Sequence, residues 1–114
     1  MAKISKREYY DLLVSTSATG GFPARNSLGC VYLHSSGRKC AIGLLIPDGH
    51  KAQYEGGYVD LILDIFPDLK DYMPDGLTVT ELREIQRCHD SQVNGWDHEK
   101  FVESLQPCFK DVLA

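Results

Sequence analysis

Two side chains of this chain could act together in covalent chemistry, the thiol of Cys40 and the imidazole of His89. A thiolate is a strong nucleophile, and an imidazole can remove the thiol proton when a carboxylate orients the ring. Asp90 directly follows His89 and is one candidate for that carboxylate, while Asp48 and Glu55 are others. The simpler interpretation is structural, because a histidine on an apolar helix face needs only a hydrogen-bond partner and a buried cysteine usually behaves as a small hydrophobic residue.

A second group of polar side chains lies in the loop from Asp48 to Gly57. This loop holds two carboxylates, an imidazole and a phenol, and then a glycine pair whose backbone amides could face an anion at a helix start. Such a loop could bind the hydroxyls of a ribose, the edge of a base or a cation. The alternative is an acidic surface loop whose glycines only let the chain turn. The residues that we predict to line a binding site are Cys40, Asp48, Tyr54, Glu55, Gly56 and His89.

Thiolate and imidazole are also zinc ligands, and the chain has four cysteines, at positions 30, 40, 88 and 108. No Cys-x-x-Cys or His-x-x-x-His pair brings two such ligands together locally. We therefore predict no metal site and no other cofactor. We expect the cysteines to be free thiols in a reducing compartment, and His34, His50 and His98 to be solvated.

Cys40 lies in the second of two apolar runs, Cys30–Leu33 and Lys39–Ile46, which flank a Ser-Ser-Gly turn at 35–37. This pattern predicts a β-hairpin, in which Leu33 would face Cys40 and Cys30 would face Gly43. The small side chains at 41 and 43 indicate that another backbone or a ligand approaches this run closely. The alternative for residues 40–46 is the first turns of a helix.

Helices are predicted on both sides of the hairpin. Ser5 with Glu8, and Thr78 with Glu81, form capping boxes, and Trp96 stands at staple spacing from Phe101 across a cap at 97. The predicted helices span residues 6–15, 58–66, 78–93 and 98–112, and the second of them should bury its Leu61 face. The fold class that we expect is therefore α+β: a small, mainly helical single domain, residues 1–114, with a central β-hairpin.

The chain has 114 residues and a net charge of −4, which fits one ordinary globular domain, alone or in a small homo-oligomer. The acidic balance argues against nucleic acid as a partner. The N-terminus has no apolar signal-peptide core, and no apolar run is long enough to span a bilayer. We therefore expect a cytoplasmic protein with no membrane partner.

Three segments of the chain resemble a family of small uncharacterised proteins that bacteriophages and prophages encode. They are Arg38-Lys39-Cys40-Ala41-Ile42-Gly43-Leu44-Leu45-Ile46-Pro47-Asp48, Tyr54-Glu55-Gly56, and Leu82 through Gln86 to His89-Asp90. The family pattern is Cys-Ala-Ile-Gly-x-Leu-Ile-Pro-Asp, an acidic Glu-Gly loop and a Leu-Gln-x-x-His-Asp helix, in which this chain has Ile85 in place of the leucine. The resemblance covers about two thirds of the chain and implies a genomic context, since many small phage proteins act against host defences.

The function that we expect is that of a phage-type accessory protein in the host cytoplasm. It would bind a nucleotide-like signalling molecule or a host defence protein without catalysis, because binding needs only shape and a few satisfied polar groups. The alternative is a Cys-dependent hydrolase or transferase that uses Cys40 and His89, with Asp90 as the orienting acid.

Overall fold

A computed structural model describes residues 4–21, 25–26, 29–30, 32–33, 37–54, 59–90 and 96–113, with the backbone only at 25–26 and 29–30. This part of the chain is mainly helical. Its elements are α1 (Lys6–Ala18), β1 (Arg25–Asn26), β2 (Gly29–Cys30), η1 (Gly43–Leu45), η2 (Lys51–Tyr54), α2 (Val59–Ile65), η3 (Pro67–Tyr72), α3 (Val79–Asp90), α4 (His98–Leu105), η4 (Gln106–Cys108) and α5 (Lys110–Leu113), where η marks a short 3-10 helix.

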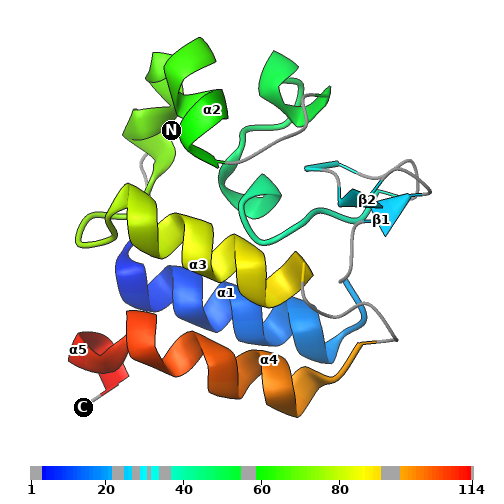
Figure 1. Ribbon diagram of the computed structural model, residues 1–114, viewed down its shortest axis with the longest axis vertical. Helices are drawn as coiled ribbons and strands as arrows, with labels where there is room; N and C mark the ends of the chain where they lie inside the picture. The colour runs from blue at the N-terminus through cyan, green and yellow to red at the C-terminus, as the bar shows by residue number, and fades with distance from the viewer. Residues whose placement is uncertain are drawn as a thin grey trace.

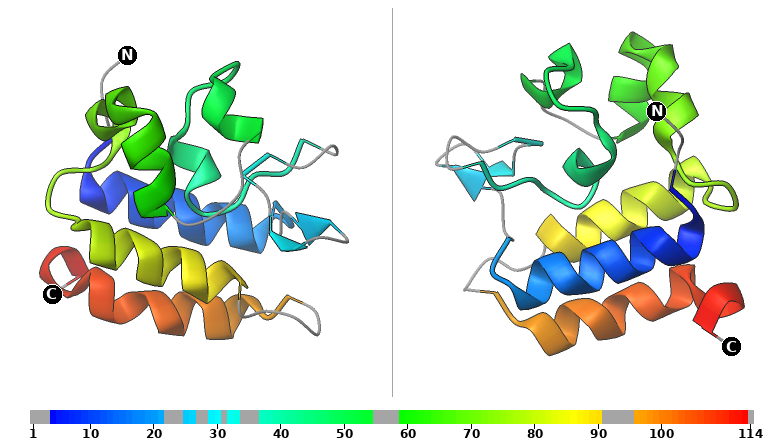
Figure 2. Two further views of the ribbon diagram at one scale, coloured as in Figure 1. Left: turned by 45° about the horizontal axis from the view of Figure 1, so that its top comes forward. Right: turned by 180° about the vertical axis from the view of Figure 1, so that it is seen from behind.

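Helices α1, α3 and α4 run side by side and form the body of the molecule (Figures 1 and 2). Helix α2 and η3 pack next to the first half of α3, on the side away from α4. The segment that carries β1, β2, η1 and η2 lies on that same side, next to the second half of α3 (Figure 1). The three long helices therefore form a base, and the short elements cover one side of it.

Local capping interactions begin the long helices where the sequence predicts. In α1 the backbone N–H of Glu8 donates to Oγ of Ser5, and the Ser5 N–H donates to the Glu8 carboxylate. Thr78 and Glu81 make the same reciprocal pair at the start of α3. The side chain of Asp97 caps α4. These interactions span three residues, so the sequence alone is enough to predict them.

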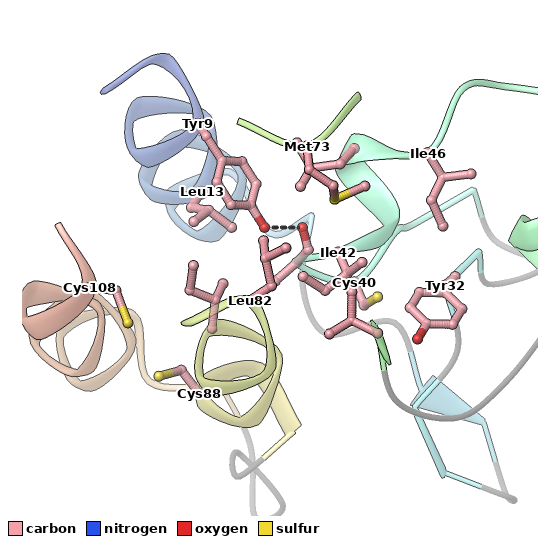
Figure 3. Close-up of a cluster of buried hydrophobic side chains, with 14 of the residues drawn as sticks. Tyr9, Leu13, Tyr32, Cys40, Ile42, Ile46, Met73, Leu82, Cys88 and Cys108 are labelled. Carbon is pink, nitrogen blue, oxygen red and sulfur yellow. Dashed lines mark hydrogen bonds between the residues drawn. The ribbon is translucent and has the colours of Figure 1, made fainter. Parts of the chain in front are cut away.

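The core lies where α1, α3 and α4 meet the turn that contains Ala41 (Figure 3). Its largest fully buried side chains come from these three helices, from α2 and η3, from Ile42 in the turn and from Phe109 after α4. Tyr9 of α1 is fully buried, and its hydroxyl donates to the Ala41 carbonyl oxygen at 2.7 Å. This bond satisfies the phenol and ties the helical base to the short elements above it.

The predicted α+β fold with a central β-hairpin is wrong. Of the pairing between residues 30–33 and 39–46, the described residues retain one isolated bridge, Leu33 with Lys39, and not the predicted Leu33–Cys40 register. β1 and β2 are a separate two-residue pair, and residues 43–45 form the helical turn η1. Residues 40–43, 45 and 46 are all buried, so this run is covered on every side and lacks the alternation of a half-buried strand.

The close approach predicted at Gly43 is confirmed. A Cβ at Gly43 would overlap the backbone carbonyl oxygen of Tyr32. The same carbonyl accepts a long hydrogen bond from the Cys40 N–H. The absence of a side chain at position 43 therefore allows η1 to lie directly against the chain at Tyr32.

Helix α2 presents a different face to the core from the one that we predicted. The sequence pattern suggested burial of the Leu61 side, but Leu61 and Ile65 are about half exposed. Val59, Ile62 and Leu63 are the buried residues of this helix. The described helices include none with both the length and the apolar character that crossing a bilayer requires.

Candidate functional site

A chain of hydrogen bonds joins the end of α3 to the turn that carries Cys40. The backbone N–H of Ile42 donates to Oε1 of Gln86 at 3.3 Å. The Gln86 amide nitrogen donates in turn to Oδ1 of Asp90 at 3.1 Å. Nδ1 of His89 lies 2.9 Å from that same oxygen. Gln86 and Asp90 thus link His89 to the turn that carries Cys40.

His89 is fully buried, as expected for a histidine on the apolar face of its helix. Because a carboxylate only accepts hydrogen bonds, Nδ1 carries the proton that is shared with Asp90. The ring also packs against the indole of Trp96, with 5.5 Å between centroids, and Trp96 packs on Phe101 at 4.9 Å. The second contact is the predicted staple across the α4 cap. His89 therefore has the hydrogen-bond partner that the structural interpretation requires.

Cys40 is fully buried beside η1, among the apolar side chains drawn in Figure 3. Burial raises the pKa of its thiol to about 12, and this outweighs the opposite effects of the Gly43 N–H, 3.3 Å from Sγ, and of the Gln86 side chain. The thiolate fraction at neutral pH is then about one in 10⁵. Such a thiol is neither accessible nor ionised, and these are the two properties of a nucleophilic cysteine.

The loop from Asp48 to Tyr54 lies on the surface. The Asp48 carboxylate is exposed and forms an ion pair with Lys39, whose hydrogen bond and charge lower the pKa of that carboxyl. Tyr54 is 77% exposed. Glu55 and Gly56, the other two predicted contacts in this loop, lie outside the described residues. Of the predicted binding residues, Asp48 and Tyr54 are therefore accessible, and Cys40 and His89 are not.

His50 is held in place, contrary to the prediction that it is solvated. Its Nδ1 accepts the backbone N–H of Ala52 at 3.0 Å, and its Nε2 lies 2.8 Å from the Asp68 carboxylate. The ring also makes an edge contact with Phe66. These bonds attach the loop after η1 to η3.

A groove of about 530 Å³ follows the exposed side of α3 and reaches the hydrogen-bonded chain at Asp90. Its lining residues are Thr80, Arg83, Glu84, Gln86, Arg87 and Asp90. Arg87 donates to Glu84 at 2.8 Å, and Arg83 lies 3.9 Å from Asp60 of α2. The side chain of Asp90 is 37% exposed, so one carboxylate both holds His89 and lines the groove.

Sequence reasoning did not identify this groove. Thr80, Arg83, Arg87 and Asp90 follow one another at helical spacings of three and four residues, which was the only indication that they share a side of α3. Charged residues at such spacing usually form a solvated helix face, so the pattern alone has little weight.

Comparisons of this chain with protein-family models, with curated proteins and with solved structures found no match. Within the described residues, no group of three or more His, Cys, Asp or Glu side chains is arranged to hold a metal ion. Cys40, Cys88 and Cys108 are buried and are not in disulfides.

Proposed function

We propose that this protein binds a small nucleotide-like ligand without catalysis, and that the ligand lies in the α3 groove. The observation that carries the proposal is the groove itself, whose volume of about 530 Å³ falls within the range of small-molecule sites. It presents two guanidinium groups together with an amide, a hydroxyl and the carboxylates of Glu84 and Asp90, all on one helix.

The two ends of the groove suit different parts of such a ligand. Arg83 and Arg87 can each donate two parallel hydrogen bonds to a phosphate, which is the geometry that guanidinium groups favour. Arg83 forms a surface ion pair with Asp60, and Arg87 forms one with Glu84. Each such pair contributes at most about 1 kcal/mol, so a phosphate that replaces the carboxylate loses little free energy. The ligand therefore gains charged contacts at little cost.

At the other end, Asp90 can accept hydrogen bonds from ribose hydroxyls or from the amino group of a base. His89 and Gln86 hold its carboxylate from the buried side. In this proposal His89 and Gln86 lie behind the groove and position Asp90, Cys40 is buried in the turn that Gln86 holds, and Asp48 and Tyr54 remain predicted contacts from their own exposed positions. A carboxylate fixed before binding loses little conformational entropy when the ligand arrives.

The burial of Cys40 supports binding over catalysis. A hydrolase or transferase that used this thiol would need it to be exposed to its substrate and partly ionised. Cys40 has zero exposure and a pKa raised to about 12 by that burial. The resemblance to phage proteins suggests the biological use, which is sequestration of a nucleotide signal of the host.

Native mass spectrometry of the protein purified from phage-infected cells is the first test. We expect a mass of a few hundred daltons above that of the chain, which is lost on denaturation and whose fragments contain a base or phosphate. Calorimetry with the released compound should then show that Arg83→Gln or Arg87→Gln weakens binding by about tenfold or more, the usual cost of losing a charge-assisted hydrogen bond.

Lys110→Gln is the matched control, because it removes one positive charge from an exposed position on α5. It should leave the affinity unchanged. Recovery of the bare chain alone, or equal affinities for Arg87→Gln and Lys110→Gln, would contradict the proposal.

A further inference from the structure

A second groove lies between α1 and α4, the two helices that run next to one another in the right-hand view of Figure 2. It has a volume of about 330 Å³. Its lining residues are Val14, His98, Glu99, Val102, Glu103 and Gln106. None of these residues lines the α3 groove, so the two surfaces are separate.

The floor of this groove is apolar and its rim is acidic. Val14 of α1 and Val102 of α4 are partly buried and form the floor. Glu99 and Glu103 are exposed and stand one helical turn apart on the rim. Among the described lining residues there is no lysine or arginine to neutralise them. The groove therefore combines a small apolar surface with negative charge on one side.

A partly buried hydrogen-bonded group holds one wall of the groove in place. The indole N–H of Trp96 donates to Oγ of Ser17 at 2.8 Å, and Oγ of Ser17 lies 2.7 Å from Nδ1 of His98. Because the indole can only donate, Ser17 accepts from Trp96. His98 of α4 is therefore tied through Ser17 of α1 to the indole that precedes α4.

We propose that the α1–α4 groove binds a basic amphipathic helix of a partner protein. An apolar side chain of that helix rests on Val14 and Val102, and lysines or arginines one turn apart pair with Glu99 and Glu103. Helix-in-groove recognition of this kind uses apolar anchors at three- and four-residue spacing, and complementary charge fixes the orientation of the bound helix. The acidic rim selects a basic partner and disfavours an acidic one.

The probe is a synthetic amphipathic helix of leucine, alanine and lysine, long enough at about 15 residues to be helical. Its matched counterpart carries glutamate at every lysine position. Titration of each into isotope-labelled full-length protein, followed by amide NMR, should show saturable shifts for the lysine peptide only. The shifts should gather on residues 10–18 of α1 and 98–105 of α4.

Three variants test the surface. The double change Glu99→Gln, Glu103→Gln should weaken binding of the lysine peptide about tenfold, in line with two exposed ion pairs. Val102→Asp places a charge on the apolar floor of the groove and should weaken binding of the lysine peptide at least as much as the double change does. Asp71→Asn is the control, since it removes the same kind of charge from η3, away from the groove. Melting curves confirm that each variant is folded.

Several outcomes would overturn this proposal. They are equal binding of the two peptides, no binding of either, shifts outside the groove, and unchanged affinity in the glutamine double variant. Concentration-dependent self-association that Val102→Asp abolishes would instead identify a second copy of this chain as the occupant. Arg87→Gln should not affect peptide binding, so failure of this proposal is distinguishable from failure of the nucleotide proposal.

Discussion

Replacement of Gly43 by alanine tests the packing of η1 against the chain at Tyr32. Gly43 does not have a positive φ, so alanine is compatible with its backbone conformation. On propensity alone, Gly→Ala at such a position stabilises a protein by about 0.4–1 kcal/mol. The tertiary contact predicts that Gly43→Ala instead destabilises the protein, because the new Cβ would overlap the Tyr32 carbonyl oxygen.

The size of this destabilisation depends on whether the Tyr32 carbonyl can move away from the new Cβ. The clash is with backbone, and Tyr32 is 2% exposed, so the carbonyl cannot swing away into solvent. Overpacking of this kind costs about 1–3 kcal/mol. We expect Gly43→Ala to lower the free energy of unfolding by about 2 kcal/mol, which for a domain of this size is a fall in Tm of about 8 °C.

The assay is chemical denaturation followed by circular dichroism, with Gly37→Ala as control. Gly37 has a φ of +92° and open space around it, so alanine there should cost only the backbone strain of about 1 kcal/mol. A Gly43→Ala protein that is as stable as the parent, or more stable, would refute the reasoning. It would favour the predicted hairpin, in which position 43 faces Cys30 and glycine only weakens a strand.

Three further predictions concern Cys40 and the buried hydrogen bonds behind the α3 groove. Cys40 should resist iodoacetamide at neutral pH until the protein unfolds, and alkylation of the native protein would contradict its burial. Because its folded pKa of about 12 exceeds the ordinary value of 9.0, the unfolded state loses the thiol proton first as pH rises. Relative to pH 7, Cys40 should therefore lower the stability by about 1.4 kcal/mol at pH 10, and Cys40→Ala should flatten the decline measured by urea denaturation. Gln86→Leu removes the acceptor of the buried Ile42 N–H and should cost about 1–3 kcal/mol, against less than about 0.5 kcal/mol for Arg87→Leu on the exposed side of the same helix. Similar losses for the two leucine variants would argue against the Gln86 hydrogen bond.

The helix starts could be predicted because their causes are local. Ser5 and Glu8 are three residues apart, as are Thr78 and Glu81, and each pair satisfies backbone groups of its own first turn. Helix α1 nevertheless continues to Ala18, three residues beyond the predicted end, through a stretch rich in serine and threonine. Ser17 in that last turn is buried against Trp96, a contact that no local pattern records.

The hairpin prediction failed because a short apolar run does not determine its own secondary structure. Residues 40–46 fit a strand or the first turns of a helix equally well by pattern. Their conformation follows from the surfaces around them, including the Tyr9 hydroxyl on Ala41 and the Tyr32 carbonyl on Gly43. The same reason explains α2, where Leu61 and Ile65 look like core residues in sequence and lie about half exposed in the structure.

For the candidate site, the sequence by itself determined the residue types and their helical spacing, including a histidine on the apolar face of its helix with a carboxylate next to it. Only the tertiary structure decided that Cys40 is buried and un-ionised, and that Gln86 links its turn to Asp90. The physical reason is distance along the chain. Desolvation and hydrogen bonds between residues more than 40 positions apart depend on how helices and turns pack, and that packing is a property of the whole fold.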